Sequence, residues 1–193
     1  MAEQITVTCR PRQMVYTSSS AYTFTSKSWD NNLTTYDLND TGAPATLLLD
    51  LSAVPKNALI KKVKYRLYLY RTDNASYCGL QMAMGYADSL TGGINSQHRV
   101  TDYKDIGLSA YKKNEETSAE QSITAAQSAQ IISAQYPVVW MNTYGSMRYY
   151  EISVDVTYEI PQNEMYVGDV KAAEVYVGNT KATAVYAGIN KIL

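Results

Sequence analysis

The fold of this chain is decided by the stretch Val63-Lys64-Tyr65-Arg66-Leu67-Tyr68-Leu69-Tyr70. The odd-numbered residues are apolar or aromatic, and the even-numbered residues are charged or carry a hydroxyl group. In a β-strand the two sets point to opposite faces. Strict alternation of this kind is typical of an antiparallel sheet that has one face on a core and one in water. The side chains expected to point inward are Val63, Tyr65, Leu67 and Leu69.

A second alternation runs from residue 150 to residue 160, where Pro161 stops it. The side chains predicted to share its core face are Tyr150, Ile152, Val154, Val156, Tyr158 and Ile160. Burying one large apolar side chain is worth about 1.5–3 kcal/mol, which is enough to fix which face of each strand points inward. Ile152, Val154 and Val156 should therefore join the core of the first stretch.

Weaker patterns fill the rest of the chain. Residues 1–46 indicate edge strands and long polar loops, and residues 46–51 and 79–87 each indicate a strand. Residues 117–135 are the helix candidate, because Ser118 and Gln121 have the spacing of a capping box and Ala-rich sequence follows. Ile131-Ile132 and residues 138–140 suit strands equally, so helix and strand both stay open for this region.

These patterns together predict an all-β protein. We expect a jelly-roll-like β-sandwich over residues 1–161 and a small β-repeat appendage over residues 162–193.

The appendage contains the same ten-residue pattern three times, with Tyr, Gly and Lys recurring in phase. A repeat this short cannot enclose a core, so it must stack on its copies, on the preceding domain or on another chain. We interpret it as a device for assembly, with a homo-oligomer, a trimer by preference, as its product; a disordered tail is the alternative. The candidate assembly residues are Tyr166, Gly168, Tyr176, Gly178, Tyr186 and Gly188.

Composition excludes several kinds of partner. The net charge of −1 gives no basic footprint for nucleic acid, and no stretch is long and apolar enough for membrane insertion. The first twelve residues lack the apolar run of a signal peptide, so we expect synthesis in a cytoplasm. Cys9 and Cys78 have the option of pairing, but two cysteines in such a chain are more often small buried apolar groups.

Catalytic and cofactor motifs are not recognisable in the sequence. His98 is the single histidine and has no partner that the sequence reveals, so we predict no enzyme and no cofactor. The segment Asp37–Gly42 resembles a calcium loop only faintly, because Thr41 and Leu48 occupy two ligand positions. A looser loop site for calcium is left open but not favoured.

Exposed aromatic side chains offer one kind of binding. The flat face of an aromatic ring complements the apolar face of a sugar ring, and the candidates in or near loops are Trp29, Tyr36, Tyr103 and Tyr144. The competing interpretation is that these aromatic residues fill the core and its rim, and it is favoured for Trp140, which follows two valines.

Two segments resemble known families. The segment Leu47–Leu69, with its strand ending in Asp50, its Leu51-Ser52 and Pro55 turn and its following long strand, resembles the disaggregatase-related jelly-roll modules. Those modules are β-sandwiches attached to cell-surface and carbohydrate-active proteins. The Tyr-Val-Gly repeats of Met165–Lys191 are similar to those that end structural and tail-associated proteins of bacteriophages.

The combination of these two resemblances implies a virion component. On that basis the leading hypothesis is a non-enzymatic structural protein of a tailed phage, in a tail, fibre or head-attached position of the virion. It would assemble with itself and with other virion proteins through the repeats, and it would contact the host surface. The alternative is a carbohydrate-binding adhesion module that recognises host surface glycans.

Overall fold

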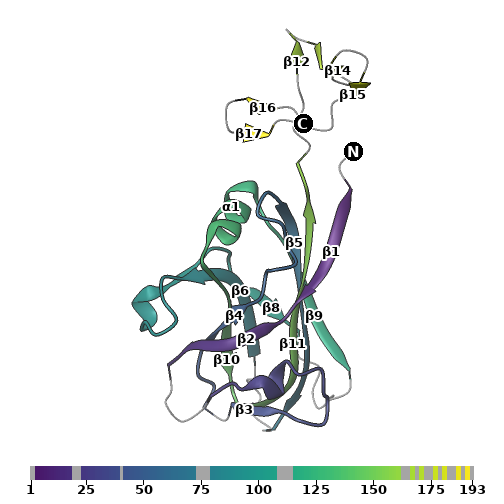
Figure 1. The fold of residues 1–193 in the computed structure, drawn as a ribbon. Coiled ribbons are helices and arrows are strands. Elements are labelled where there is room, and N and C mark those ends of the chain that lie inside the picture. Colours follow the sequence, from purple (N-terminus) through teal and green to yellow (C-terminus); the bar gives the residue numbers. More distant parts are fainter. Residues whose placement is uncertain are drawn as a thin grey trace.

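The computed structural model describes residues 3–18, 23–39, 41–72, 79–107 and 115–161, and the backbone of six short strands between residues 166 and 191. Two antiparallel sheets face each other across a common core. Figure 1 shows α1 (Ala125–Ser133) at one end of this sandwich and β3 (Asp37–Asn39) at the other. The protein is an all-β, jelly-roll-like sandwich, as the sequence predicts.

The first sheet has the two predicted long strands at its centre. β5 (Leu59–Arg71) pairs antiparallel with β11 (Met147–Glu159) along nearly its whole length. β9 (Glu116–Ser122) borders β5, whereas β1 (Gln4–Cys9) and the short β3 both border β11. The sandwich is therefore organised around the two stretches with the strictest alternation.

The second sheet supplies the opposite half of the core. Its strands run in the order β2 (Pro11–Thr17), β4 (Ala45–Leu49), β10 (Tyr136–Tyr144), β6 (Gly79–Ala87) and β7 (Gln97–Arg99), and β8 (Lys104–Ile106) also pairs with β6. Two one-turn 3-10 helices, η1 (Ser26–Ser28) and η2 (Ile94–Ser96), lie in the connections. The predicted strands near residues 46–51 and 79–87 are confirmed.

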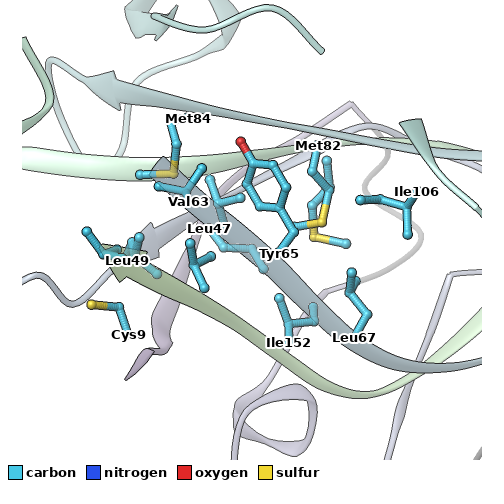
Figure 2. Packing of buried hydrophobic residues seen from close by; sticks show 14 of the residues in the cluster. Cys9, Leu47, Leu49, Val63, Tyr65, Leu67, Met82, Met84, Ile106 and Ile152 are labelled. Atoms are coloured by element: carbon cyan, nitrogen blue, oxygen red, sulfur yellow. The ribbon is translucent and has the colours of Figure 1, made fainter. Parts of the chain in front are cut away.

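The core lies between the inward faces of the two sheets. The predicted inward side chains are all buried in one cluster, namely Val63, Tyr65, Leu67, Leu69, Ile152, Val154 and Val156. Figure 2 shows Val63, Tyr65 and Leu67 close to side chains of the other sheet, including Leu47, Leu49, Met82 and Met84. The prediction of which face points inward is confirmed.

A β-bulge in β11 shifts the second alternation. The register with β5 slips between Tyr149 and Glu151, so Tyr149 rather than Tyr150 continues the core face. Tyr150 packs against Tyr36 instead, with ring centroids 5.3 Å apart. The prediction for Tyr150 is wrong because one extra residue in a strand reverses the faces on one side of it. The prediction for Ile160 is also wrong, because β11 ends at Glu159 and leaves Ile160 exposed.

The helix candidate divides into a strand and a helix. Residues 116–122 form β9, so the predicted cap at Ser118 and Gln121 is wrong: both residues pair with β5. The helix α1 starts after Thr124, whose Oγ1 accepts a hydrogen bond from the backbone N of Gln127. The side chain of Gln127 in turn accepts from the backbone N of Thr124 at 2.9 Å. A capping box is present, but six residues later than predicted.

Each ten-residue repeat forms a two-stranded hairpin of its own. The hairpins are β12 (Tyr166–Val167) with β13 (Val170–Lys171), β14 (Tyr176–Val177) with β15 (Thr180–Lys181), and β16 (Tyr186–Ala187) with β17 (Asn190–Lys191). Each repeat therefore contains two short strands. The residues Gly168, Gly178 and Gly188 lie outside the described residues, as do all side chains of the repeats.

Cys9 is a free thiol at the end of β1 and is only 2% exposed. Burial, with smaller contributions from the Asp50 and Asp155 carboxylates, raises the pKa of the Cys9 thiol to about 12. The other cysteine, Cys78, lies outside the described residues. The environment of Cys9 fits its interpretation as a small buried apolar group.

Candidate functional site

A groove lies between the end of β6 and the helix α1. Its volume is about 410 Å³, within the ~300–1,000 Å³ range of small-molecule sites. Its lining side chains are Tyr86, Ala87, Asp88, Gln130, Ser133, Ala134 and Gln135. An aromatic ring, a carboxylate, two amides and a hydroxyl thus converge on one concavity, which we call the α1 groove.

His98 holds two of these groups in place. It lies opposite Tyr86 in the β6–β7 pair, and the two rings stack with centroids 4.7 Å apart at 26°. The Nε2 of His98 is 2.7 Å from Oδ2 of Asp88. The backbone N of Asp88 also donates to the carbonyl of Ser96 at 2.9 Å, which closes the loop between β6 and β7 at its base. One side chain therefore supports both the ring and the carboxylate of the groove.

The other wall of the groove is the last turn of α1 and the residues after it. Three contacts fix the helix: the capping box at its start, the Oγ of Ser128 accepting from the backbone N of Ile60 at 2.8 Å, and Nζ of Lys56 donating to the carbonyl of Ile132 at 3.2 Å. The last contact places a cation at the negative end of the helix. Gln130 and Ser133 are consequently held over the end of β6.

Two further hollows continue from the groove around the end of α1. One, of about 460 Å³, is lined in part by Lys56, Asn57 and Ser133. The other, of about 350 Å³, shares Gln135 with the groove and includes Arg12 and Asp50. The pKa of Asp50 is lowered, chiefly because its carboxylate accepts a hydrogen bond from the backbone N of Ser52 at 2.9 Å. The region offers charged and polar groups beyond the groove itself.

The lining of the groove suits binding better than hydrolysis. Glycosidases use a pair of carboxylates that face each other across the scissile bond. Among the lining side chains that the structure describes, Asp88 alone carries a carboxylate. The geometry therefore supports recognition of a polar ligand that has one flat apolar face.

The aromatic residues predicted to stack on sugars do not gather in one place. Trp29 is partly buried and packs against the core, and the ring of Tyr103 lies 4.3 Å from the guanidinium of Arg99. Tyr36 and Tyr144 are each 37% exposed, but Tyr36 directly precedes β3 of the first sheet, whereas Tyr144 ends β10 in the second. None of the four lines the α1 groove.

Trp140, which the sequence places in the core or at its rim, packs against a smaller apolar cluster. That cluster contains Val15, Leu48, Ala87 and Val138, and Trp140 lies against it as a partly buried residue. The two valines before Trp140 divide between this cluster and the main core.

The groove could not be found from the sequence because the residues that line it form no recognisable motif. The partner of His98 is Asp88, ten residues earlier, and only the antiparallel pairing of β6 with β7 brings the two together. Tyr86 shares its strand face with the core residues Met82 and Met84, so it resembles a core residue in the sequence. A predicted hairpin between residues 79–87 and 97–99 would have brought Tyr86, Asp88 and His98 together and so indicated this wall of the groove.

In the described part of the loop considered for calcium, the side-chain oxygens of Asp37 and Asn39 accept hydrogen bonds from nearby residues. The carboxylate of Asp37 accepts hydrogen bonds from Thr25 and Ser28, and Oδ1 of Asn39 accepts from Thr41 and Ala43. Across the described ranges, no three His, Cys, Asp or Glu side chains gather where they could hold a metal ion. In the same part of the chain no helix has the length and apolar character needed to cross a membrane.

Comparisons with known proteins are limited to distant structural similarity. No family model matches the chain, and no curated protein matches it, so the two family resemblances stay predictions. A pectin-binding carbohydrate-binding module is 14% identical with a TM-score of 0.38, covering 74% of this chain and 90% of that one. A truncated AlyQ with CBM32 and alginate lyase domains is 12% identical with a TM-score of 0.38, covering 86% of this chain and 36% of that one.

A third solved structure contains the CBM22-1 and GH10 modules of the Clostridium thermocellum endo-1,4-β-D-xylanase 10B with xylohexaose. It is 12% identical with a TM-score of 0.33, covering 85% of this chain and 27% of that one. This chain thus spans well under two thirds of two of the three structures. Identities and scores this low identify no ligand, and the proposals below are argued from the residues of this chain.

Proposed function

We propose that this protein is a non-catalytic glycan-binding module that holds a sugar residue in the α1 groove. The observation that carries the proposal is the support of the Tyr86 ring and the Asp88 carboxylate by one residue, His98. Because both groups are fixed before a ligand arrives, binding would cost little side-chain entropy. The amides of Gln130 and Gln135 stand at the same groove.

A sugar matches these groups in shape and in polarity. The apolar face of a pyranose would lie on the Tyr86 ring, while neighbouring hydroxyls would donate to Asp88 and exchange hydrogen bonds with the two amides. A hydrogen bond to a charged group contributes about 1.5–3 kcal/mol, more than one between neutral groups. Tyr86 and Asp88 should therefore dominate the affinity.

A glycan array followed by titration calorimetry on the best binder tests the proposal. Tyr86→Ala and Asp88→Asn should each weaken binding about tenfold or more, equivalent to ~1.4 kcal/mol. His98→Ala should weaken binding through the loss of support, and His98→Phe should restore the part due to ring stacking. Tyr144→Ala is the matched control, because it removes an exposed tyrosine away from the groove. Equal loss in the Tyr144 and Tyr86 variants, or no binder on the array, would contradict the proposal.

A second proposal, assembly through the repeats, is supported by the three hairpins. Each forms a separate two-stranded sheet, and the Tyr of every repeat pairs with the Lys five positions later. Because an isolated two-stranded hairpin is marginally stable in water, three equivalent ones favour stacking on another surface. A homo-oligomer built this way, in a phage virion where it contacts host glycans, would combine both proposals.

Static light scattering tests the assembly proposal. The full chain should have the mass of an oligomer, a trimer by preference, and the fragment 1–161 should have the mass of a monomer. A monomer in both cases would exclude assembly through the repeats. Detection of the protein in purified phage particles by mass spectrometry would test the virion hypothesis separately.

A further inference from the structure

Arg148 lies between two tyrosine rings on the outer face of the first sheet, at the end opposite α1. Its guanidinium carbon is 4.8 Å from the ring centroid of Tyr36 and 5.9 Å from that of Tyr70. Met147 and Tyr149, its neighbours in β11, point into the core, so Arg148 points away from it. Opposite it in β3 lies Leu38, which is 42% exposed. We call these four residues, Tyr36, Leu38, Tyr70 and Arg148, the Arg148 patch.

Other cations on this face of the sheet have acidic partners. Arg66 contacts Glu116 at 2.6 Å, Lys62 contacts Glu120 at 2.8 Å, and Arg10 contacts Glu151 at 2.8 Å. The hydrogen bond from Arg66 lowers the pKa of Glu116. These positive side chains on the outer face are therefore offset by neighbouring carboxylates.

Arg148 departs from this pattern. Within the described part of the chain it has no carboxylate partner, and its Nε is buried with no hydrogen-bond acceptor. A guanidinium that contacts two aromatic rings has lost part of its side-chain freedom, and its planar fork matches a carboxylate. The arrangement suits an anion, and no carboxylate in the described part of the chain fills that role.

We propose that the Arg148 patch is a second binding site and that it takes a carboxylate-bearing sugar residue, such as a uronic acid. The carboxylate would pair with the guanidinium of Arg148, and the sugar ring would lie on the exposed part of Tyr36, which is 37% accessible. A stable protein interface buries about 800 Å² on each partner, whereas the exposed apolar part of the patch consists of Tyr36 and Leu38. The size of the patch favours one sugar residue over a protein. The site stands on its own residues and does not depend on the α1 groove.

Titration calorimetry with an oligomer of glucuronic acid, and with the same oligomer after reduction of its carboxyl groups, tests the proposal. The acidic oligomer should bind, and carboxyl reduction or Arg148→Gln should each weaken binding about tenfold or more, equivalent to ~1.4 kcal/mol. Arg148→Lys keeps the charge without the planar fork and should recover only part of the affinity. Tyr36→Ala should also weaken binding, and its thermal melting curve shows whether the fold is retained.

The matched control is Lys62→Gln, which removes one positive charge from the same face of the sheet and should change affinity by less than about twofold. Tyr86→Ala should leave binding of the acidic oligomer intact, so that failure at one site is distinguishable from failure at the other. Three results would overturn the proposal: equal binding of the acidic and reduced oligomers, equal effects of Lys62→Gln and Arg148→Gln, or no binding of the acidic oligomer. A polyglutamate peptide that binds more tightly than the oligomer and depends equally on Arg148 would assign the patch to a protein partner instead.

Discussion

Burial of single ionisable side chains makes the stability of the sandwich depend on alkaline pH. The Cys9 thiol has its pKa raised from 9.0 to about 12, chiefly by burial, and burial also raises the pKa of the Tyr65 phenol. An unfolded chain would release the Cys9 proton above about pH 9, while the folded chain retains it, so alkaline pH favours unfolding. The stabilisation is fully present below about pH 9 and is lost as the pH rises towards 12.

We therefore expect the free energy of unfolding to fall by about 1.4 kcal/mol per pH unit from Cys9 alone above pH ~9. Urea unfolding curves between about pH 8 and pH 11 measure the slope. Cys9→Ala should make the slope shallower, whatever it does to stability at neutral pH. An unchanged slope in this variant would show that the thiol is accessible in the folded protein.

Gly85 is a residue that the packing of the second sheet requires. A Cβ at this position would overlap the backbone oxygen of His98 and lie 2.7 Å from Nε1 of Trp140. Because a strand backbone cannot move aside cheaply, Gly85→Ala should destabilise the protein by about 3 kcal/mol, the upper part of the usual range for overpacking. Gly93→Ala is the control, since nothing lies within 4 Å of its added Cβ. Chemical denaturation of the two variants makes the comparison, and similar stabilities would contradict the assigned packing.

At the residue scale, alternation predicts burial well until the register changes. It places Tyr65 and Val154 correctly because each core-facing position follows from the pleat. For Tyr150 it predicts burial correctly but the wrong face, because the bulge depends on how β11 meets β5, which the sequence of β11 alone does not contain.

At the scale of elements, the helix α1 depends on its capping box. Thr124 and Gln127 satisfy each other's backbone N–H groups, and the nine-residue helix has few other sources of intrinsic stability. Thr124→Ala should lower the free energy of unfolding by about 1 kcal/mol. Gln130→Ala, on the same helix, should stay within about 0.5 kcal/mol of the wild type. Urea denaturation distinguishes the two, and equal effects would mean that the cap contributes nothing.

The same region shows why the boundaries of α1 could not be predicted. Residues 116–122 are polar and have moderate preference for either structure, so their ladder with β5 decides in favour of a strand. A second pair with the spacing of a capping box, Thr124 and Gln127, then starts the helix. Because both pairs have the same spacing, the spacing alone could not decide which of them caps the helix.

At the scale of the whole molecule, the two-sheet architecture was predictable and the α1 groove was not. Long alternating strands imply a sandwich because each must cover its apolar face. The groove requires β6 and the start of the loop after it to meet the end of α1, and Gln130 of α1 lies more than forty residues after Asp88 in the chain. Such a meeting follows from the order of strands in the sheets, which local patterns do not encode.

If the sandwich binds the sugar and the repeats assemble the protein, removing the repeats should lower the avidity for a glycan surface and leave the affinity for a soluble sugar unchanged. None of the repeat strands that the structure describes shares a sheet with a sandwich strand. The fragment 1–161 should therefore melt within about 2 °C of the full chain and bind a soluble sugar at the α1 groove with the same affinity. On a glycan-coated surface the full chain should bind about 10²-fold more tightly, because an oligomer engages several sugars at once. Surface plasmon resonance measures binding to the coated surface, and calorimetry measures binding in solution. Equal surface affinity of the fragment and the full chain would contradict assembly through the repeats. A much lower melting temperature of the fragment would show that the repeats stabilise the sandwich.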